Sequence, residues 1–217
     1  MKKNISTWVA ILICLLPLAY LGVIWNSLPQ LVPLHFNYEM KPDRMGDKSE
    51  IWRVTGIMAG VSILIYFLIT NIHRFDPKRK NRPESGTFKK LALGLVVFFA
   101  ALNMIIISSI KGSIVMQNLL FPLLGLLLAF LGNYMNNIKP NYFAGFRLPW
   151  TLSDDENWRK THHLAGKIWF GGGLFLAVVS LLLPFKFTFP LFIAIVAVMS
   201  LIPAIYSYRL FKNKTTL

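Results

Sequence analysis

The side chains of this 217-residue chain that could do chemistry gather between residues 139 and 167. This segment reads KPNYFAGFRLPWTLSDDENWRKTHHLAGK and is the most polar stretch of an otherwise apolar chain. Its three acidic residues, followed by His162 and His163, could in principle hold a metal ion or transfer protons. The spacing matches no HExxH-type motif, however, and the acids are already explained as helix-capping residues. A catalytic or metal cluster is therefore the alternative interpretation, and a folded structural segment is the preferred one.

The same segment contains the signals that start a helix. Ser153 followed three residues later by Glu156 predicts a capping box, so the helix is expected to begin at Ser153. Acidic residues 154–156 then occupy the first turn, where the helix dipole favours negative charge. Along this helix one face carries Trp158, Thr161, His162 and Ala165. Other faces carry two expected ion pairs, Asp155 with Arg159 and Glu156 with Lys160.

Arg147 is the strongest candidate for recognition in this segment. It lies in a turn framed by Gly145 and Pro149, next to the rings of Phe146 and Trp150. A guanidinium in this setting can stack on rings and bind a carboxylate, a backbone carbonyl or a lipid phosphate. The alternative is a residue that only closes the loop. Under either interpretation residues 136–167 are expected to fold into one cap against the lipid headgroups.

A second polar segment, residues 26–50, carries His35, Asp43 and Asp47. These side chains could be imagined as metal ligands, but their spacing fits no known pattern. We expect a compact loop held by its own hydrogen bonds and stiffened by its prolines. Positive and negative charges in this loop nearly cancel, so electrostatic capture of a ligand is not indicated.

The elements that must position both segments are apolar helices. With 55% hydrophobic residues and a mean hydropathy of +0.54, the chain is predicted to be an all-α polytopic membrane protein. Six transmembrane helices are predicted over residues 5–25, 51–72, 91–110, 118–135, 168–183 and 191–208. Residues 184–190 are expected to form a tight turn. Gly56 and Gly60 form a GxxxG pattern that would allow close packing against a neighbouring helix.

The distribution of the basic residues predicts the orientation. The formal net charge is +14, but the cations concentrate on one side of the predicted membrane, so direct nucleic-acid binding is not expected. Two lie at the N-terminus, seven in residues 73–90, five in residues 136–167 and three after residue 208, against six on the other side. By the positive-inside rule, both termini are cytoplasmic.

The sequence divides into three predicted parts. The predicted parts are an N-terminal helix pair (1–72) with an outer loop (26–50), a basic cytoplasmic linker (73–90) and a four-helix domain (91–217) containing the cytoplasmic cap (136–167). The span interiors lack ionisable residues, which weakens a proton-coupled transporter, an ion channel or an intramembrane protease as interpretations. The single cysteine, Cys14, allows no intrachain disulfide and is expected to be a packing residue.

Two stretches of the chain resemble known protein families. The stretch GNYMNNIKPNYFAGFRLPWTLSDDENWRKTHHLAG resembles the signature of the SdpI family of bacterial membrane proteins, over roughly residues 132–170. The outer loop resembles the small N-terminal domain of unknown function that is often found in the same proteins. The residues that carry this second resemblance are Pro29, Pro33, His35, Phe36, Asn37, Pro42, Asp43, Gly46 and Lys48.

The resemblance implies a multi-pass immunity protein of the bacterial cytoplasmic membrane, with no catalytic residues and no cofactor. Its implied partners, besides the lipid bilayer, are a secreted toxic peptide outside and a transcriptional repressor held at the membrane inside. The implied cap residues are Asn141, Gly145, Arg147, Pro149, Trp150, Thr151, Trp158, Thr161 and His162. The outer-loop candidates are Pro33, His35, Phe36, Asn37, Pro42 and Asp43. A small-solute transporter or channel and a membrane hydrolase remain the alternatives.

Overall fold

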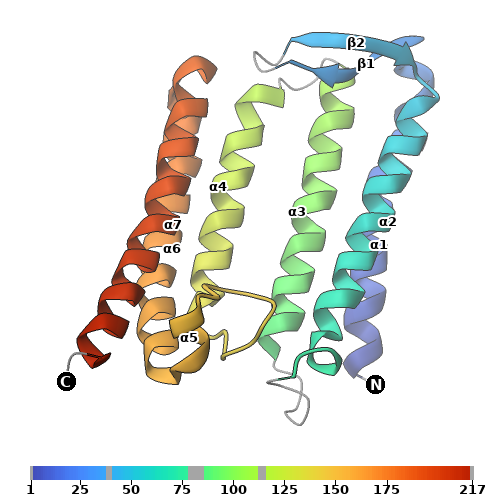
Figure 1. Ribbon diagram of the computed structural model, residues 1–217. Coiled ribbons are helices and arrows are strands. Elements are labelled where there is room, and N and C mark those ends of the chain that lie inside the picture. Colours follow the sequence, from blue (N-terminus) through green and yellow to red (C-terminus); the bar gives the residue numbers. More distant parts are fainter. Residues whose placement is uncertain (1, 38–40, 78–85, 112–115, 216–217) are drawn as a thin grey trace.

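Six helices form the body of the protein (Figure 1). The computed structural model describes residues 2–37, 41–77, 86–111 and 116–215. Within these ranges six helices are long and apolar enough to cross a membrane, which confirms the predicted architecture. They are α1 (Lys2–Ile24), α2 (Glu50–Thr70), α3 (Gly86–Ile110), α4 (Met116–Met135), α6 (Asp155–Leu182) and α7 (Phe185–Thr215). Shorter elements are the helix α5 (Pro149–Ser153) and the 3-10 turns η1 (Trp25–Ser27) and η2 (Ile72–Arg74).

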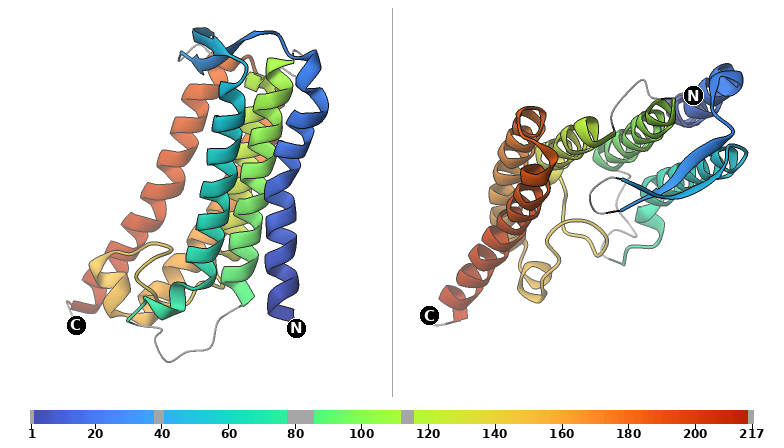
Figure 2. Two further views of the ribbon diagram at one scale, coloured as in Figure 1. Left: turned by 90° about the vertical axis from the view of Figure 1, so that its right-hand side faces the viewer. Right: turned by 90° about the horizontal axis from the view of Figure 1, so that it is seen from above.

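The helices stand in an elongated row. Viewed along the helix axes, α1 and α2 lie at one end of the row, α6 and α7 lie at the other, and α3 and α4 join them (Figure 2). Both chain termini lie at the same end of the bundle, here called the termini end (Figure 1). The opposite end, which carries the two strands, is called the hairpin end.

The outer loop folds as a β-hairpin. Strands β1 (Leu31–Phe36) and β2 (Pro42–Asp47) pair antiparallel, with Leu31 opposite Asp47. The register shifts between Pro33 and His35, and on this irregular strand Val32 and Leu34 both pack on the hairpin ends of α1, α2 and α3. Val32 is fully buried there. The expectation of a compact loop is confirmed, and its strands are an addition to the all-α prediction.

Several element boundaries differ from those predicted. The turn expected over residues 184–190 is wrong, because α7 already begins at Phe185 and continues through Pro190. Pro184 sits just before the first turn, where a missing N–H costs nothing, and the Thr188 hydroxyl donates to its carbonyl at 3.2 Å. Helix α3 begins at Gly86, inside the predicted basic linker, of which residues 78–85 lie outside the described chain.

The closest helix packing joins α4 to α6. A Cβ atom on Gly125 of α4 would lie 2.7 Å from the Gly173 carbonyl oxygen, and one on Gly173 of α6 would lie 2.6 Å from the Gly125 carbonyl oxygen. These glycines therefore let two backbones touch, as small residues do in membranes. The GxxxG prediction for Gly56 and Gly60 is wrong for the described chain, since a Cβ on either would meet no described atom within 4 Å.

Candidate functional site

The cap connects α4 to α6 across the termini end. Its loop leaves α4, extends toward α3, and returns to α5 (Figure 1). The turn in this loop is organised by Asn141, which is almost fully buried. The amide of Asn141 donates to the carbonyls of Lys139 and Ala144, and its oxygen accepts from the backbone N–H groups of Phe143 and Ala144. An asparagine fits because only an amide supplies both donors and an acceptor at this short reach.

Thr151 fastens the start of α5. The fully buried Thr151 hydroxyl donates to the Phe146 carbonyl at 2.6 Å and accepts from the backbone N–H of Leu148 at 2.9 Å. Pro149 occupies the first helical position, where its missing N–H is not needed. The GFRLPWT stretch is thus a helix entry closed by its own threonine.

His162 holds the loop to α6. The His162 ring stacks on Trp158 with centroids 4.0 Å apart, and only 1% of the residue is exposed. The backbone N–H of Phe146 donates to His162 Nε2 at 3.1 Å, so that nitrogen carries no proton and Nδ1 donates to the Trp158 carbonyl at 2.8 Å. Both ring nitrogens are therefore engaged, and the neutral imidazole is a structural link between loop and helix.

Gly145 is needed for the same contact. Its φ of 102° lies in the left-handed region, and a Cβ atom at this position would collide with His162 Nε2. Trp158 stacks on the His162 ring. The indole of Trp158 is itself held in place, because its Nε1–H donates to the Ile138 carbonyl at 2.7 Å in the buried interior. The structure thus joins five predicted cap residues, Asn141, Gly145, Thr151, Trp158 and His162, in one folded unit.

Arg147 lies on the surface of this unit. Its Nη1 donates to the Tyr142 carbonyl at 2.9 Å and closes the loop. In the described chain the neighbouring rings take other partners, since Phe146 packs edge-on against His162, and Trp150 packs against Phe211 of α7. The structure therefore shows the loop-closing contact, and leaves the exposed guanidinium facing outward from the cap.

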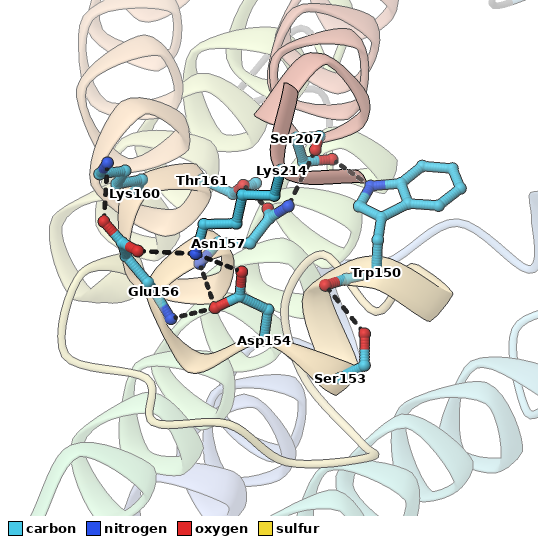
Figure 3. Close-up of polar contacts among 9 residues, drawn as sticks. All are labelled: Trp150, Ser153, Asp154, Glu156, Asn157, Lys160, Thr161, Ser207 and Lys214. Atoms are coloured by element: carbon cyan, nitrogen blue, oxygen red, sulfur yellow. Dashed lines mark hydrogen bonds and ion pairs between the residues drawn. The ribbon is translucent and has the colours of Figure 1, made fainter. Parts of the chain in front are cut away.

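The α5–α6 junction is a polar cluster that reaches α7 (Figure 3). Asp154 has an extended backbone and caps α6, with Oδ1 accepting from the N–H groups of Glu156 at 2.8 Å and Asn157 at 3.2 Å. The Lys214 ammonium donates to Asp154 and Glu156 at 2.8 and 2.7 Å. The hydrogen bond from Lys214 is the main cause that lowers the pKa of Asp154.

The predicted capping box at Ser153 is wrong. Ser153 is the last residue of α5, and its hydroxyl donates backward to the Trp150 carbonyl at 3.3 Å. The chain turns at Asp154, so the next residue supplies the cap. Of the two expected ion pairs, Glu156–Lys160 forms at 2.8 Å, whereas Asp155 and Arg159 form no ion pair with each other.

Contacts to α7 involve residues that sequence reasoning missed. The buried Asn157 amide donates to the Ser207 carbonyl at 2.9 Å, and the Trp150 indole N–H donates to the Ser207 hydroxyl at 2.8 Å (Figure 3). The Thr161 hydroxyl completes the cluster by donating to the Asn157 side chain at 3.0 Å. The available signal was Ser207 itself, a small polar residue close to the end of an apolar span.

The outer-loop candidates lie at the opposite end of the molecule. His35 Nδ1 is 2.6 Å from Asp43 Oδ1, and both side chains are exposed. Asp47 instead accepts from the Gln30 side chain at 2.8 Å, so the three imagined metal ligands do not converge. Asn37 closes the hairpin through its backbone and side chain, both bonded to Lys41. Pro33 and Phe36 lie in β1, and Pro42 begins β2.

An apolar cavity of about 390 Å³ lies beneath the cap loop. It is lined by Ile69 of α2, Phe88 of α3, Met135 of α4 and Phe143 of the loop. The two halves of the helix row therefore meet here, around a space suited to an apolar group.

Comparison with known proteins gives four findings. Residues 137–207 match the SdpI/YfhL protein family, and residues 12–59 match a domain of unknown function, DUF1648. The chain is 27% identical over 214 residues to the Immunity protein SdpI of Bacillus subtilis (strain 168), covering 98% of each chain. No solved structure matches.

Proposed function

Because residues 137–207 match the SdpI/YfhL protein family and nearly the whole chain is similar to an immunity protein, we propose that the protein is a membrane immunity protein of this family that protects its producer from a secreted, membrane-active toxic peptide. The observation that carries this proposal is the extent of the similarity to an immunity protein, which covers 98% of both chains and therefore includes the hairpin, the spans and the cap. The family match over residues 137–207 coincides with the cap and the helices that hold it.

In this proposal the termini end faces the cytoplasm. The support is the asymmetry of the cations, which concentrate in the terminal segments, the linker and the cap. The hairpin end then faces outward, where a secreted peptide arrives first.

The hairpin supplies the surface that would meet the peptide. Strand β2 has an exposed residue at five of its six positions, including Asp43 and Met45. Val32 anchors the hairpin on the three N-terminal helices, so a peptide that binds the hairpin would contact a surface held in place by the bundle. Among the candidates, His35, Phe36 and Asp43 lie in the strands of this hairpin.

The cap supplies the inner surface. Its buried residues build the unit, while Arg147 is exposed and can offer guanidinium donors to a carboxylate of a cytoplasmic partner. A transcriptional repressor held at the membrane, as the family resemblance implies, would bind this face.

The geometry of His162 weighs against a membrane hydrolase that uses this residue as its base. Both nitrogens are committed to the Phe146 N–H and the Trp158 carbonyl, and the ring is stacked and buried. A general base must instead reach the proton that it removes.

The test is protection of living cells. In the native organism the gene is deleted, and the deletion strain is grown in medium conditioned by its parent. We expect growth inhibition and membrane depolarisation, both reversed by a plasmid copy of the chain. Equal growth of parent and deletion strain in conditioned medium that kills an unrelated sensitive bacterium would refute the immunity role.

A further inference from the structure

A basic pocket lies at the termini end, away from the buried core of the cap. It has a volume of about 500 Å³ and opens between the end of α4, α6 and α7. Its polar lining consists of Asn136, Arg159, Lys160, His163, Lys167 and Tyr206. Three cations in one pocket of this size need an explanation, because like charges repel.

The positive charge of this pocket is only partly neutralised. Lys160 pairs with Glu156 at 2.8 Å, and Glu156 is itself shared with Lys214. Arg159 and Lys167 form no ion pair in the described chain, and both are exposed. The pocket therefore keeps an excess of positive charge and has donors directed at no protein acceptor.

The arrangement of the cations suits a phosphate group. Arg159, His163 and Lys167 are four residues apart and form one row along α6, about 12 Å from first to last. His163 is oriented by Asn136, with its Nδ1 3.3 Å from the amide oxygen. Long side chains on both sides of His163 can bend toward one anion, and Tyr206 lines the pocket from α7.

A separate apolar groove follows farther along α6 and α7, toward the membrane interior. Its volume is about 310 Å³, and it is lined by residues of α6 and α7 that include Ile168, Gly172, Ile195 and Met199. Ile168 lies one helical turn beyond Leu164, which lines the basic pocket. Gly172 lies close to α7, since a Cβ atom on it would be 3.0 Å from Met199 Sδ.

The pocket and the groove are lined by the same face of α7. Tyr206 of the pocket and Met199 and Ile195 of the groove are separated by seven and eleven residues, so they share one face of α7. The walls are held together at this level, because the Trp169 indole N–H donates to the Met199 carbonyl at 2.9 Å.

We propose that this combined site binds one anionic phospholipid, with its phosphate among Arg159, Lys160 and Lys167 and one acyl chain along the groove. Cationic pockets between helices at a membrane surface select anionic headgroups. The adjoining apolar groove distinguishes a lipid from free phosphate, because only a lipid brings an acyl chain. The bound lipid would fasten α6 to α7 beside the cap.

The test uses the full-length protein purified in a neutral detergent. Its thermal unfolding is followed while dioleoylphosphatidylglycerol, dioleoylphosphatidylcholine or inorganic phosphate is added. We expect stabilisation by phosphatidylglycerol alone. The double variant Arg159→Gln/Lys167→Gln should weaken phosphatidylglycerol binding by about 30-fold, or roughly fivefold for each cation removed.

Two further variants make the result specific. Arg74→Gln/Lys139→Gln removes two exposed cations at the same end that do not line the pocket, and should bind like the wild type. Gly172→Leu should fill the groove and weaken lipid binding without removing charge. An equal response to phosphatidylcholine, a response to inorganic phosphate as large as that to phosphatidylglycerol, or equal loss in the control variant would overturn the proposal. The proposal would also be overturned if the Arg159→Gln/Lys167→Gln variant bound phosphatidylglycerol with unchanged affinity. The melting temperature of this variant without lipid establishes that it is folded.

Discussion

The contact between α4 and α6 makes a quantitative prediction about Gly173. A Cβ atom added here would lie 2.6 Å from the Gly125 carbonyl oxygen and 2.8 Å from the Ala129 Cα, whereas ordinary contacts begin near 3.4 Å. Both obstacles are backbone atoms, which cannot rotate away, so the two helices must separate by roughly 1 Å along their contact. Overpacking of this kind costs about 1–3 kcal/mol.

The expected net effect of Gly173→Ala includes an opposing gain. Alanine is favoured over glycine within a helix by about 1 kcal/mol, so we expect a net loss of about 0–2 kcal/mol. Gly171 supplies the matched control two residues away, because a Cβ there would meet no described atom within 4 Å. Gly171→Ala is therefore expected to leave stability unchanged or to raise it by up to about 1 kcal/mol.

The assay is unfolding of the two purified variants in the same detergent, by titration with a denaturing detergent or by heat. Gly173→Ala should unfold first, and the wild type and Gly171→Ala should follow. Equal stability of the two variants would show that α4 and α6 do not touch through these glycines. It would refute the reasoning from backbone contact.

Four further predictions concern the cap and the orientation. Asp154→Ala should cost about 1 kcal/mol through the lost α6 cap, whereas Ser153→Ala should cost much less; the opposite order in thermal unfolding would restore the capping box. Because the pKa of Asp154 is lowered in the folded protein, its contribution should be complete above the ordinary carboxyl pKa and fade as pH falls from about 5 toward the lowered value, and Asp154→Asn should flatten that part of the stability profile. Arg147→Lys should lose protection at normal membrane levels if the planar fork binds a partner, whereas survival equal to wild type with lysine, and loss only with alanine, would reduce Arg147 to an electrostatic anchor. In a cysteine-free chain, a cysteine at Glu50 should react with an impermeant reagent in intact cells and one at Lys160 should not; the reverse pattern would invert the topology.

Some of this protein follows from the sequence alone. Six long apolar runs are sufficient to predict six spans, because a helix that satisfies its own backbone hydrogen bonds is the stable form for such a run in lipid. The importance of residues 139–167 was also predictable from the sequence, since Asn141, Gly145 and Thr151 are residue types with specific backbone roles. Both inferences depend only on the types of neighbouring residues, which the sequence gives directly.

The remaining features needed the tertiary structure. Residues 171–173 are three consecutive glycines, yet only the packing of α4 shows that Gly173 touches a backbone and that Gly171 does not. The N-cap of α6 is Asp154 because Ser153 belongs to the preceding helix α5. Lys214, 60 residues later in the chain, donates a hydrogen bond to this capping residue. The sequence left catalysis as the alternative interpretation of His162, and only the structure shows the Phe146 N–H and the Trp158 carbonyl at its two ring nitrogens. Gly125, Lys214 and Phe146 are each distant in sequence from the residue that they contact, so a pattern of neighbours along the chain cannot identify them.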